Sequence, residues 1–388
     1  MKKWMVILMA ITMTANASAL AAEPAYQGPA GAFYTGMGAG WNLGNTLDAT
    51  NNRLLEGLGL PIDYETAWGN PETTLELIRT VKAAGFQTIR VPVTWANHIG
   101  PAPAYEVQGA WMDRVREVVD MVLSEGMYCI INVHHDTGTH GWLHASAQVV
   151  EEESAKFAAL WRQIAECFRD YNDHLIFEGF NEMLDEHNNW VYPRTPSARD
   201  AINHFNQLFV DTVRATGGDN ATRVLIVSPY GSANDRSALE DLVMPTDSAE
   251  NALVVQIHYY SPVSYCFDID GDNNLQTVWT ENGGREALLT ALDGVTELFT
   301  SKGIPVVMGE FAASHKGNEA DRAEWAKFVV DTCEAHGVKC IWWDNGGKVA
   351  SVDGYGTMGL LDRYELAWLY PDVVEALTGV RVTNVSTK

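Results

Sequence analysis

The stretch "IFEGFNEM" (residues 176–183) joins an apolar run to a polar end, and this combination decides the fold. It begins like a buried strand and ends in Asn181 and Glu182. A second stretch, "VVMGEFAA" (306–313), has the same form and carries Glu310. A buried carboxylate is costly unless it has a partner or a function. Two such acids at the ends of separate strands therefore indicate a site.

Apolar runs of this kind recur along the 388-residue chain, and longer amphipathic stretches separate them. Three of these stretches end in glycine just before the next run, which is the usual C-terminal signal of a helix. Continuously apolar strands that alternate with helices are typical of parallel strands buried on both faces. Eight such units predict an α/β fold of the (β/α)8 TIM barrel type, in a single domain. The expected strands are 38–44, 87–93, 128–135, 175–182, 224–229, 253–260, 305–311 and 340–346, and the three helical stretches are 71–85, 112–126 and 323–337.

A doubly wound parallel sheet is the alternative architecture. It usually has fewer strands and a glycine-rich phosphate-binding turn that opens a helix. The glycines of "GMGAGWNLGN" (36–45) instead precede and occupy the first expected strand. The pattern therefore favours the barrel.

The first 22 residues have the pattern of a secretory signal peptide. Lys2 and Lys3 precede an apolar run, and small residues follow it as cleavage choices. The apolar run is too short to span a bilayer comfortably. We therefore expect residues 1–22 to be a signal peptide, residues 23–388 to be the folded domain, and the mature protein to be secreted into the periplasm or the medium.

The formal net charge is −24, from 26 basic and 50 acidic residues. Such a charge repels nucleic acid and anionic membranes and keeps an exported protein soluble. We expect a monomer that binds neither, and the charge is compatible with a neutral substrate. The five cysteines are an odd number, so at least one remains unpaired within the chain.

Polar and aromatic residues gather at the ends of the expected strands. In an eight-stranded barrel, functional groups project from the C-terminal ends of the strands, so these residues should meet at one rim. The residues expected there are Asn45, Arg90, His134, His135, Asn181, Glu182, His258, Tyr260, Glu310 and Trp343.

Two carboxylates that face each other across such a rim suit glycoside hydrolysis. We expect Glu310 to be the nucleophile, stabilised by Arg90 and Tyr260, and Glu182 to be the proton donor and general base. A retaining mechanism requires carboxyl groups about 5–5.5 Å apart, against about 6.5–9.5 Å for inversion. His258 is expected to hold Glu182, Asn181 to bond the sugar 2-hydroxyl, and Trp343 to lie under the sugar. This chemistry requires no metal and no cofactor.

The motifs resemble those of glycoside hydrolase family 5, the cellulase family, and its endo-β-1,4-glucanase branch. The resemblance implies a retaining (β/α)8 enzyme that cleaves internal bonds of cellulose and related β-glucans by double displacement. It also implies the strand-three histidine at His134, with His135 beside it. Xyloglucan, xylan or mannan remain alternative substrates. The motifs are "GWNLGNTLDA" (40–49), "IRVPVTW" (89–95), "NVHHD" (132–136), "GFNEM" (179–183), "IHYYSP" (257–262), "GEF" (309–311) and "WWDNG" (342–346).

Four further hypotheses follow from the sequence. A metal-dependent barrel hydrolase could use the residues of "HHDTGTHGWLH" (134–144), and a non-catalytic sugar-binding barrel would be expected to lose one of the two acids. The acidic loop "DIDGDNN" (268–274) resembles a calcium loop but lacks the EF-hand register. Candidate aromatic platforms for outer sugar rings are Trp68, Trp95, Trp142, Trp190 and Tyr230.

Overall fold

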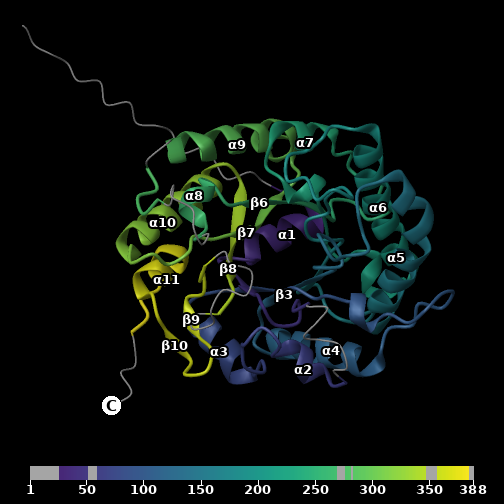
Figure 1. The fold of residues 1–388 in the computed structure, drawn as a ribbon, viewed down its shortest axis with the longest axis horizontal. Helices are drawn as coiled ribbons and strands as arrows, with labels where there is room; N and C mark the ends of the chain where they lie inside the picture. Colours follow the sequence, from purple (N-terminus) through teal and green to yellow (C-terminus); the bar gives the residue numbers. More distant parts are fainter. Residues whose placement is uncertain (1–25, 51–58, 269–275, 281–282, 347–355, 384–388) are drawn as a thin grey trace, which may run out of the picture.

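Eight parallel strands form a closed barrel in the computed structural model, which describes residues 26–50, 59–268, 276–280, 283–346 and 356–383. Each strand pairs with the next in sequence, and β1 pairs with β8 to close the ring. Helices surround this ring (Figure 1). The predicted (β/α)8 barrel is therefore confirmed, with all eight strands in their expected places. The strands are β1 (Gly40–Leu43), β2 (Thr88–Val91), β3 (Tyr128–Asn132), β4 (Leu175–Glu178), β5 (Leu225–Val227), β6 (Leu253–Tyr259), β7 (Val306–Phe311) and β8 (Val338–Asp344).

The three predicted helical stretches are helices, and each is followed by a glycine with positive φ. Gly85, Gly126 and Gly337 have φ of 96°, 72° and 75°, which reverses the chain into the next strand. A short antiparallel pair, β9 (Leu361–Asp362) with β10 (Ala367–Trp368), was not expected. The helices are α1 (Gly28–Gly36), α2 (Pro61–Glu65), α3 (Leu75–Ala83), α4 (Gly109–Ser124), α5 (Ala147–Cys167), α6 (Pro196–Ala215), α7 (Arg236–Asp241), α8 (Val263–Cys266), α9 (Gly284–Leu298), α10 (Glu319–Ala335) and α11 (Pro371–Thr378).

Several helices begin at a side chain that caps their first turn. The hydroxyls of Thr74, Ser146 and Thr195 accept from the backbone N–H groups three residues on, at the starts of α3, α5 and α6. The carboxylate of Asp235 does the same for α7. Such caps satisfy N–H groups that have no partner within the helix. They fix where each βα loop ends, and hence where the strand-end residues can lie.

The barrel interior changes from apolar to polar along its axis. At the end where the strands begin, α1 lies across the opening (Figure 1), and its Phe33 packs with Met37 into the interior. Alternate residues of each strand point inward. In β3, Ile130 belongs to this apolar floor, whereas Asn132 lies nearer the other end and takes part in polar contacts. The floor comprises Ala30, Phe33, Met37, Ile130, Ile176, Val224, Ile226, Val254, Val307 and Ile341.

The predicted signal peptide and most of the acidic loop 268–274 lie outside the described residues. Within the described part of the chain, no helix combines the length and the apolar character that crossing a membrane requires. All five cysteines are unpaired.

A buried ion pair ties the end of α2 to α4, away from the barrel interior. Both Arg114 and Glu65 are buried, and the carboxylate accepts from the guanidinium at 2.8 and 3.0 Å. It also accepts from the backbone N–H of Thr73 at 2.7 Å. Removing one partner of a buried pair leaves the other charge uncompensated, which is strongly destabilising.

Glu65→Gln is therefore expected to lower the free energy of unfolding by about 3 kcal/mol. Urea denaturation followed by circular dichroism measures the change. The matched control is Glu117→Gln, because Glu117 contacts the same guanidinium at 2.6 Å but has a 59% exposed side chain. That substitution should cost less than about 1 kcal/mol. Equal losses from the two variants would contradict the argument.

Candidate active site

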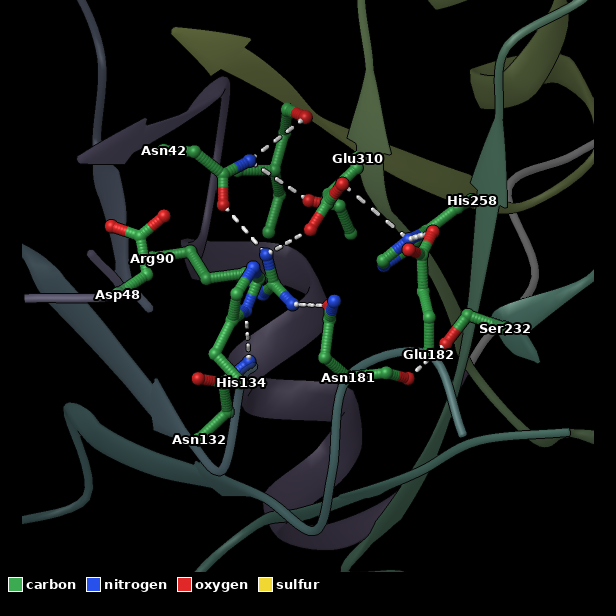
Figure 2. A network of polar contacts seen from close by, with 12 residues as sticks. Asn42, Asp48, Arg90, Asn132, His134, Asn181, Glu182, Ser232, His258 and Glu310 are labelled. Atoms are coloured by element: carbon green, nitrogen blue, oxygen red, sulfur yellow. Dashed lines mark hydrogen bonds and ion pairs between the residues drawn. The ribbon is translucent and has the colours of Figure 1, made fainter. Parts of the chain in front are cut away.

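Arg90 lies at the centre of a polar network at the C-terminal ends of the strands (Figure 2). Its side chain is fully buried, and the contacts use all five of its N–H groups. Nε and Nη2 donate to the two oxygens of Glu178 at 2.6 and 2.7 Å. Nη1 donates to Glu310 at 2.7 Å and to Asn42 at 2.9 Å, and Nη2 also donates to Asn181 at 2.7 Å. The guanidinium is therefore held in one orientation.

Glu310 is held from two sides. Arg90 donates to Oε1, and the Tyr260 hydroxyl donates to Oε2 at 2.9 Å. The residue is 5% exposed. Burial raises the pKa of the Glu310 carboxyl above its usual value, and the neighbouring His258 and Arg90 oppose this shift. The two donors both favour the ionised form.

A bulge in β7 is the reason that Glu310 points into the barrel. Gly309 is an extra residue between Met308, which pairs with Ile257, and Glu310, which pairs with His258. Without an extra residue, period-two alternation from the inward-facing Val307 would turn Glu310 outward. Bulges commonly re-aim a side chain beside an active site.

Glu182 approaches the same space from the loop after β4. Its Oε1 lies 2.7 Å from Nδ1 of His258, and its side chain is 19% exposed. Burial is the main reason that the pKa of Glu182 rises to about 8, and Glu178 adds to the shift whereas Arg90 opposes it. Burial also lowers the pKa of His258 to about 4. At neutral pH the pair is therefore a protonated carboxyl beside a neutral imidazole.

The two acids are close enough to act on one glycosidic bond. A carboxylate oxygen of Glu182, one of Glu310 and a ring nitrogen of His258 all lie within 4.8 Å of one another. This is near the separation of about 5–5.5 Å that retaining glycoside hydrolases use, and well below that of inverting ones. In Figure 2 both side chains reach the His258 ring, with carboxylate oxygens of Glu182 and Glu310 at 2.7 and 3.5 Å from Nδ1. A separation this short is typical of enzymes in which the second acid attacks the sugar carbon itself, and inverting enzymes use a longer one to admit a water.

The remaining predicted site residues lie around this pair. Asn181 accepts from Arg90 through Oδ1, which leaves its Nδ2 as the donor for a ligand. The ring of Trp343 is half-buried and lies parallel to His134, with centroids 5.7 Å apart. His135 is more exposed, and its ring contacts His134 edge-on at 4.5 Å. The neighbouring Trp342 is buried.

Asn45 lies in the loop after β1, and its backbone bonds to Asp48 and Asn70. Its N–H donates to Asp48 at 3.0 Å, and its carbonyl accepts from Asn70 at 3.0 Å. Its φ of 56° is a left-handed conformation that asparagine tolerates well. The structure therefore places Asn45 at the rim, but not in the network around Arg90.

Two residues of this network, Glu178 and Asn132, were not recognised as site residues from the sequence, and Asn42 at the end of β1 also belongs to it. Glu178 accepts from Arg90 and from Asn132, which donates at 2.8 Å. Asn42 accepts from Arg90 and donates to the carbonyl of Gly309 at 2.9 Å. A signal was available for Glu178, because a charged residue inside an otherwise apolar strand requires a partner.

Asn132 also sets the tautomer of His134. Its Oδ1 accepts from the backbone N–H of Val93 at 3.1 Å, which orients the amide. Its Nδ2 then faces Nδ1 of His134 at 3.0 Å, so Nδ1 must be the acceptor. Burial holds the pKa of His134 well below its usual value, and the ring is neutral. His134 therefore carries its proton on Nε2 and presents a donor to a ligand.

Two groups of residues in the described chain could hold a metal ion: Asp48 with His134 and His135, and Glu182 with His258 and Glu310. The histidine-rich stretch 134–144 does not converge as a whole, because both oxygens of Asp136 accept hydrogen bonds, from Trp95 N and Trp142 Nε1. In the first group, the Nε2–H tautomer of His134 lacks the free lone pair that a metal requires there.

Two of the five candidate platforms are wrong. Trp95 is fully buried and donates from Nε1 to the carbonyl of Asn132 at 2.9 Å. Tyr230 is 2% exposed, and its hydroxyl donates to the carbonyl of Asn189 at 2.7 Å. Both rings fill the space behind the strand ends. Trp68 and Trp142 are half-buried, and Trp190 is 63% exposed, so these three remain accessible.

Gly309→Ala tests the bulge. An added Cβ would lie 2.2 Å from Oε1 of the buried Gln256, so β7 must shift and Glu310 with it. We expect catalytic efficiency to fall at least about tenfold, with overpacking that costs about 1–3 kcal/mol. Steady-state kinetics and thermal melting measure the two effects. Gly109→Ala is the control, because its Cβ meets nothing within 4 Å, and it should leave both unchanged. Wild-type kinetics for Gly309→Ala would contradict the role of the bulge.

Comparisons with known proteins agree with this geometry. Residues 48–349 match the family model described as cellulase (glycosyl hydrolase family 5). Endoglucanase A of Clostridium longisporum is 37% identical over 342 residues, which cover 88% of this chain and 64% of that relative's length. A GH5-4 broad specificity endoglucanase from Ruminococcus champanellensis, solved with bound cellotriose, is 40% identical with a TM-score of 0.81, over 89% and 97% of the two chains. A GH5 xyloglucan-specific endo-β-1,4-glucanase from a metagenomic library, also solved with cellotriose, is 38% identical with a TM-score of 0.80, over 90% and 98%. The chain belongs to glycosyl hydrolase family 5.

Proposed function

We propose that the protein is an endo-β-1,4-glucanase that hydrolyses internal bonds of cellulose and related β-glucans with retention of configuration. The observation that carries this proposal is the approach of the Glu182 and Glu310 carboxylates to within 4.8 Å, in a chain of this family. The spacing supports double displacement. The relatives named above are endoglucanases, which supports the choice of a β-glucan as substrate.

In the first step, Glu310 attacks the anomeric carbon and the protonated Glu182 gives its proton to the leaving oxygen. Arg90 and Tyr260 keep Glu310 ionised and aimed, because both donate to its carboxylate. A pKa near 8 keeps Glu182 protonated at neutral pH, as a general acid requires. The product of this step is a covalent glycosyl ester on Glu310, and the departing chain carries the proton.

In the second step, the ionised Glu182 removes a proton from water, which attacks the anomeric carbon and releases Glu310. The contact of Oε1 with His258 leaves Oε2 of Glu182 to take that proton. Two inversions give net retention. Asn181 is placed to donate from Nδ2 to the sugar 2-hydroxyl, an interaction that strengthens in the transition state.

The sugar beside the cleaved bond is proposed to lie over Trp343, with His134 donating to one of its hydroxyls. The ring of Trp343 is half-buried beside His134, and the Nε2–H tautomer supplies the donor. His135, which is more exposed than His134, would bound the next sugar. Trp68, Trp142 and Trp190 are the remaining candidates for outer platforms.

Xyloglucan is a second candidate substrate. One structural neighbour is described as xyloglucan-specific and another as broad in specificity. Both share the fold and a similar degree of identity with this chain, so the family alone does not select among these glucans. We also retain the predictions that residues 1–22 direct secretion, that residues 23–388 are one catalytic domain, and that the enzyme is a monomer.

The metal-dependent alternative is less well supported by the site. The tautomer of His134 and the two donors to Asp136 oppose metal ligation at the end of β3. Activity that survives prolonged treatment with EDTA would agree with the metal-free mechanism.

A substrate panel tests the proposed function. We expect hydrolysis of barley β-glucan and carboxymethyl cellulose, with slower or no action on xylan and glucomannan at equal mass; xyloglucan is included for the second candidate. Proton NMR of the first-formed product of a cello-oligosaccharide should show the β-anomer. An α-anomer would exclude double displacement, and hydrolysis of xylan or mannan alone would move the enzyme to another substrate class.

Substitution of each acid separates the two roles. Glu182→Ala should be rescued by azide on an activated aryl cellobioside and yield the β-glycosyl azide, because the anion replaces the activated water after Glu310 has reacted. Glu310→Ala should not give the β-azide, because no covalent intermediate can form. Glu182→Gln and Glu310→Gln should each lower turnover of β-glucan by at least about a hundredfold. Near-wild-type turnover in either variant would overturn its assigned role.

A further inference from the structure

Glu178 is a third buried carboxylate beneath the two reacting ones, and the mechanism above does not use it. It is fully buried and accepts three hydrogen bonds, two from Arg90 and one from Asn132. The pair with Arg90 is bidentate, which is the strongest geometry for these two groups. Such an acid requires an explanation, because a buried ion pair is not by itself a source of stability.

We propose that Glu178 is a positioning residue: it holds the Arg90 guanidinium in the orientation that contacts both Glu310 and Asn181, and it balances the charge of Arg90 beneath the reacting acids. This inference rests on the proposed function and deepens it. The two bonds to Glu178 occupy Nε and one N–H of Nη2, so the rotation of the guanidinium plane is fixed. The remaining N–H groups then point at Glu310, Asn42 and Asn181.

The balance of charge follows from the groups that surround these carboxyls. Among the described residues, the other titratable groups that face them are His134, His258 and Tyr260. Burial holds the pKa values of the two histidines below their usual range and that of Tyr260 above it, so all three are neutral at neutral pH. Arg90 and Glu178 therefore form a neutral pair, and Glu310 supplies the remaining charge.

Loss of the Glu178 charge should shift the titration of both reacting acids in one direction. With glutamine at this position, the positive charge of Arg90 would no longer be balanced. It would stabilise the ionised forms of Glu182 and Glu310 and lower the pKa of each. Glu182 must be protonated to act as the acid, so the basic limb of the activity profile moves to lower pH. The acidic limb, which reports the ionisation of Glu310, moves the same way.

The test is the pH dependence of kcat/KM on barley β-glucan, a neutral substrate. Wild type should lose activity above a pH of about 8, the pKa of Glu182. In Glu178→Gln both limbs of the bell-shaped profile of kcat/KM should move to lower pH by about one unit. Glu178→Asp keeps the charge but shortens the reach, so kcat should fall while the limbs stay in place. An unmoved profile in Glu178→Gln would overturn the proposal.

A matched control separates this effect from loss of stability. Glu65 is equally buried and equally bidentate, with Arg114, but lies outside the site. Glu65→Gln should lower the melting temperature and leave both limbs where they are in wild type. A shift of the profile in this control, equal to that in Glu178→Gln, would show that instability alone moves the limbs and would overturn the proposal.

A readout that needs no turnover distinguishes failure of the inference from failure of the proposed function. The carboxyl 13C signal of Glu182, assigned by its absence in Glu182→Gln, reports its pKa directly. The pKa of Glu182 should be lower in Glu178→Gln than in wild type, even if no glucan is hydrolysed. If that variant does not fold, the double variant Arg90→Met/Glu178→Met removes both charges together, and the Glu182 pKa should then stay at or above the wild-type value. A fall in the double variant would overturn the charge balance.

Discussion

The structure of the site depends on one buried guanidinium. Arg90 lies where hydration is lost, and each of its five N–H groups has an acceptor in the protein. Complete removal of a charged group from water is costly. A protein tolerates this burial only when hydrogen bonds and an opposite charge replace the water. The acceptors come from β1, β4 and β7 and from the loop after β4. One side chain on β2 therefore links three segments, around β1, β4 and β7, that are far apart in the sequence.

The same guanidinium gives two similar acids different chemistry. Glu310 is contacted by Arg90 and Tyr260, both of which favour its ionised form. Glu182 lies beside a neutral imidazole. Burial is the largest influence on its pKa, which rises to about 8. Pairs of carboxyls whose surroundings push their pKa values apart are the usual basis for separate acid and nucleophile roles. The fold achieves the difference through position alone, since both residues are glutamates.

Much of the fold was predictable because the signals were local. Strand lengths, helix periodicity and the glycines at 85, 126 and 337 each depend on a few neighbouring residues. The bulge at Gly309 was not predictable in this way. Strict alternation in "VVMGEF" assigns Glu310 to the outer face, and only the extra residue relative to β6 and β8 turns it inward. Its membership of the site was inferred from its motif and not from periodicity.

The errors have a common cause: the sequence does not show how deeply a side chain near the end of a strand is buried. Trp95 and Tyr230 follow strands and look like rim aromatics, but each lies behind the strand ends and satisfies its polar atom there. Glu178 lies inside an expected strand, and its three hydrogen bonds make it part of the site. Contacts between segments that are distant in the sequence decide these cases.

The helix across the base of the barrel has a consequence for how a polymer is handled. Phe33 and Met37 of this segment seal the interior with the apolar floor, and the carbonyl of Met37 accepts from Thr88 at 2.6 Å. The barrel interior is thus closed at its base by apolar side chains and is not a channel. A polysaccharide therefore cannot pass through the barrel and must bind across the rim at the C-terminal ends of the strands. Both fragments of the cleaved polysaccharide then lie outside the barrel. Each can dissociate, and the enzyme does not need to move along the polymer from a chain end.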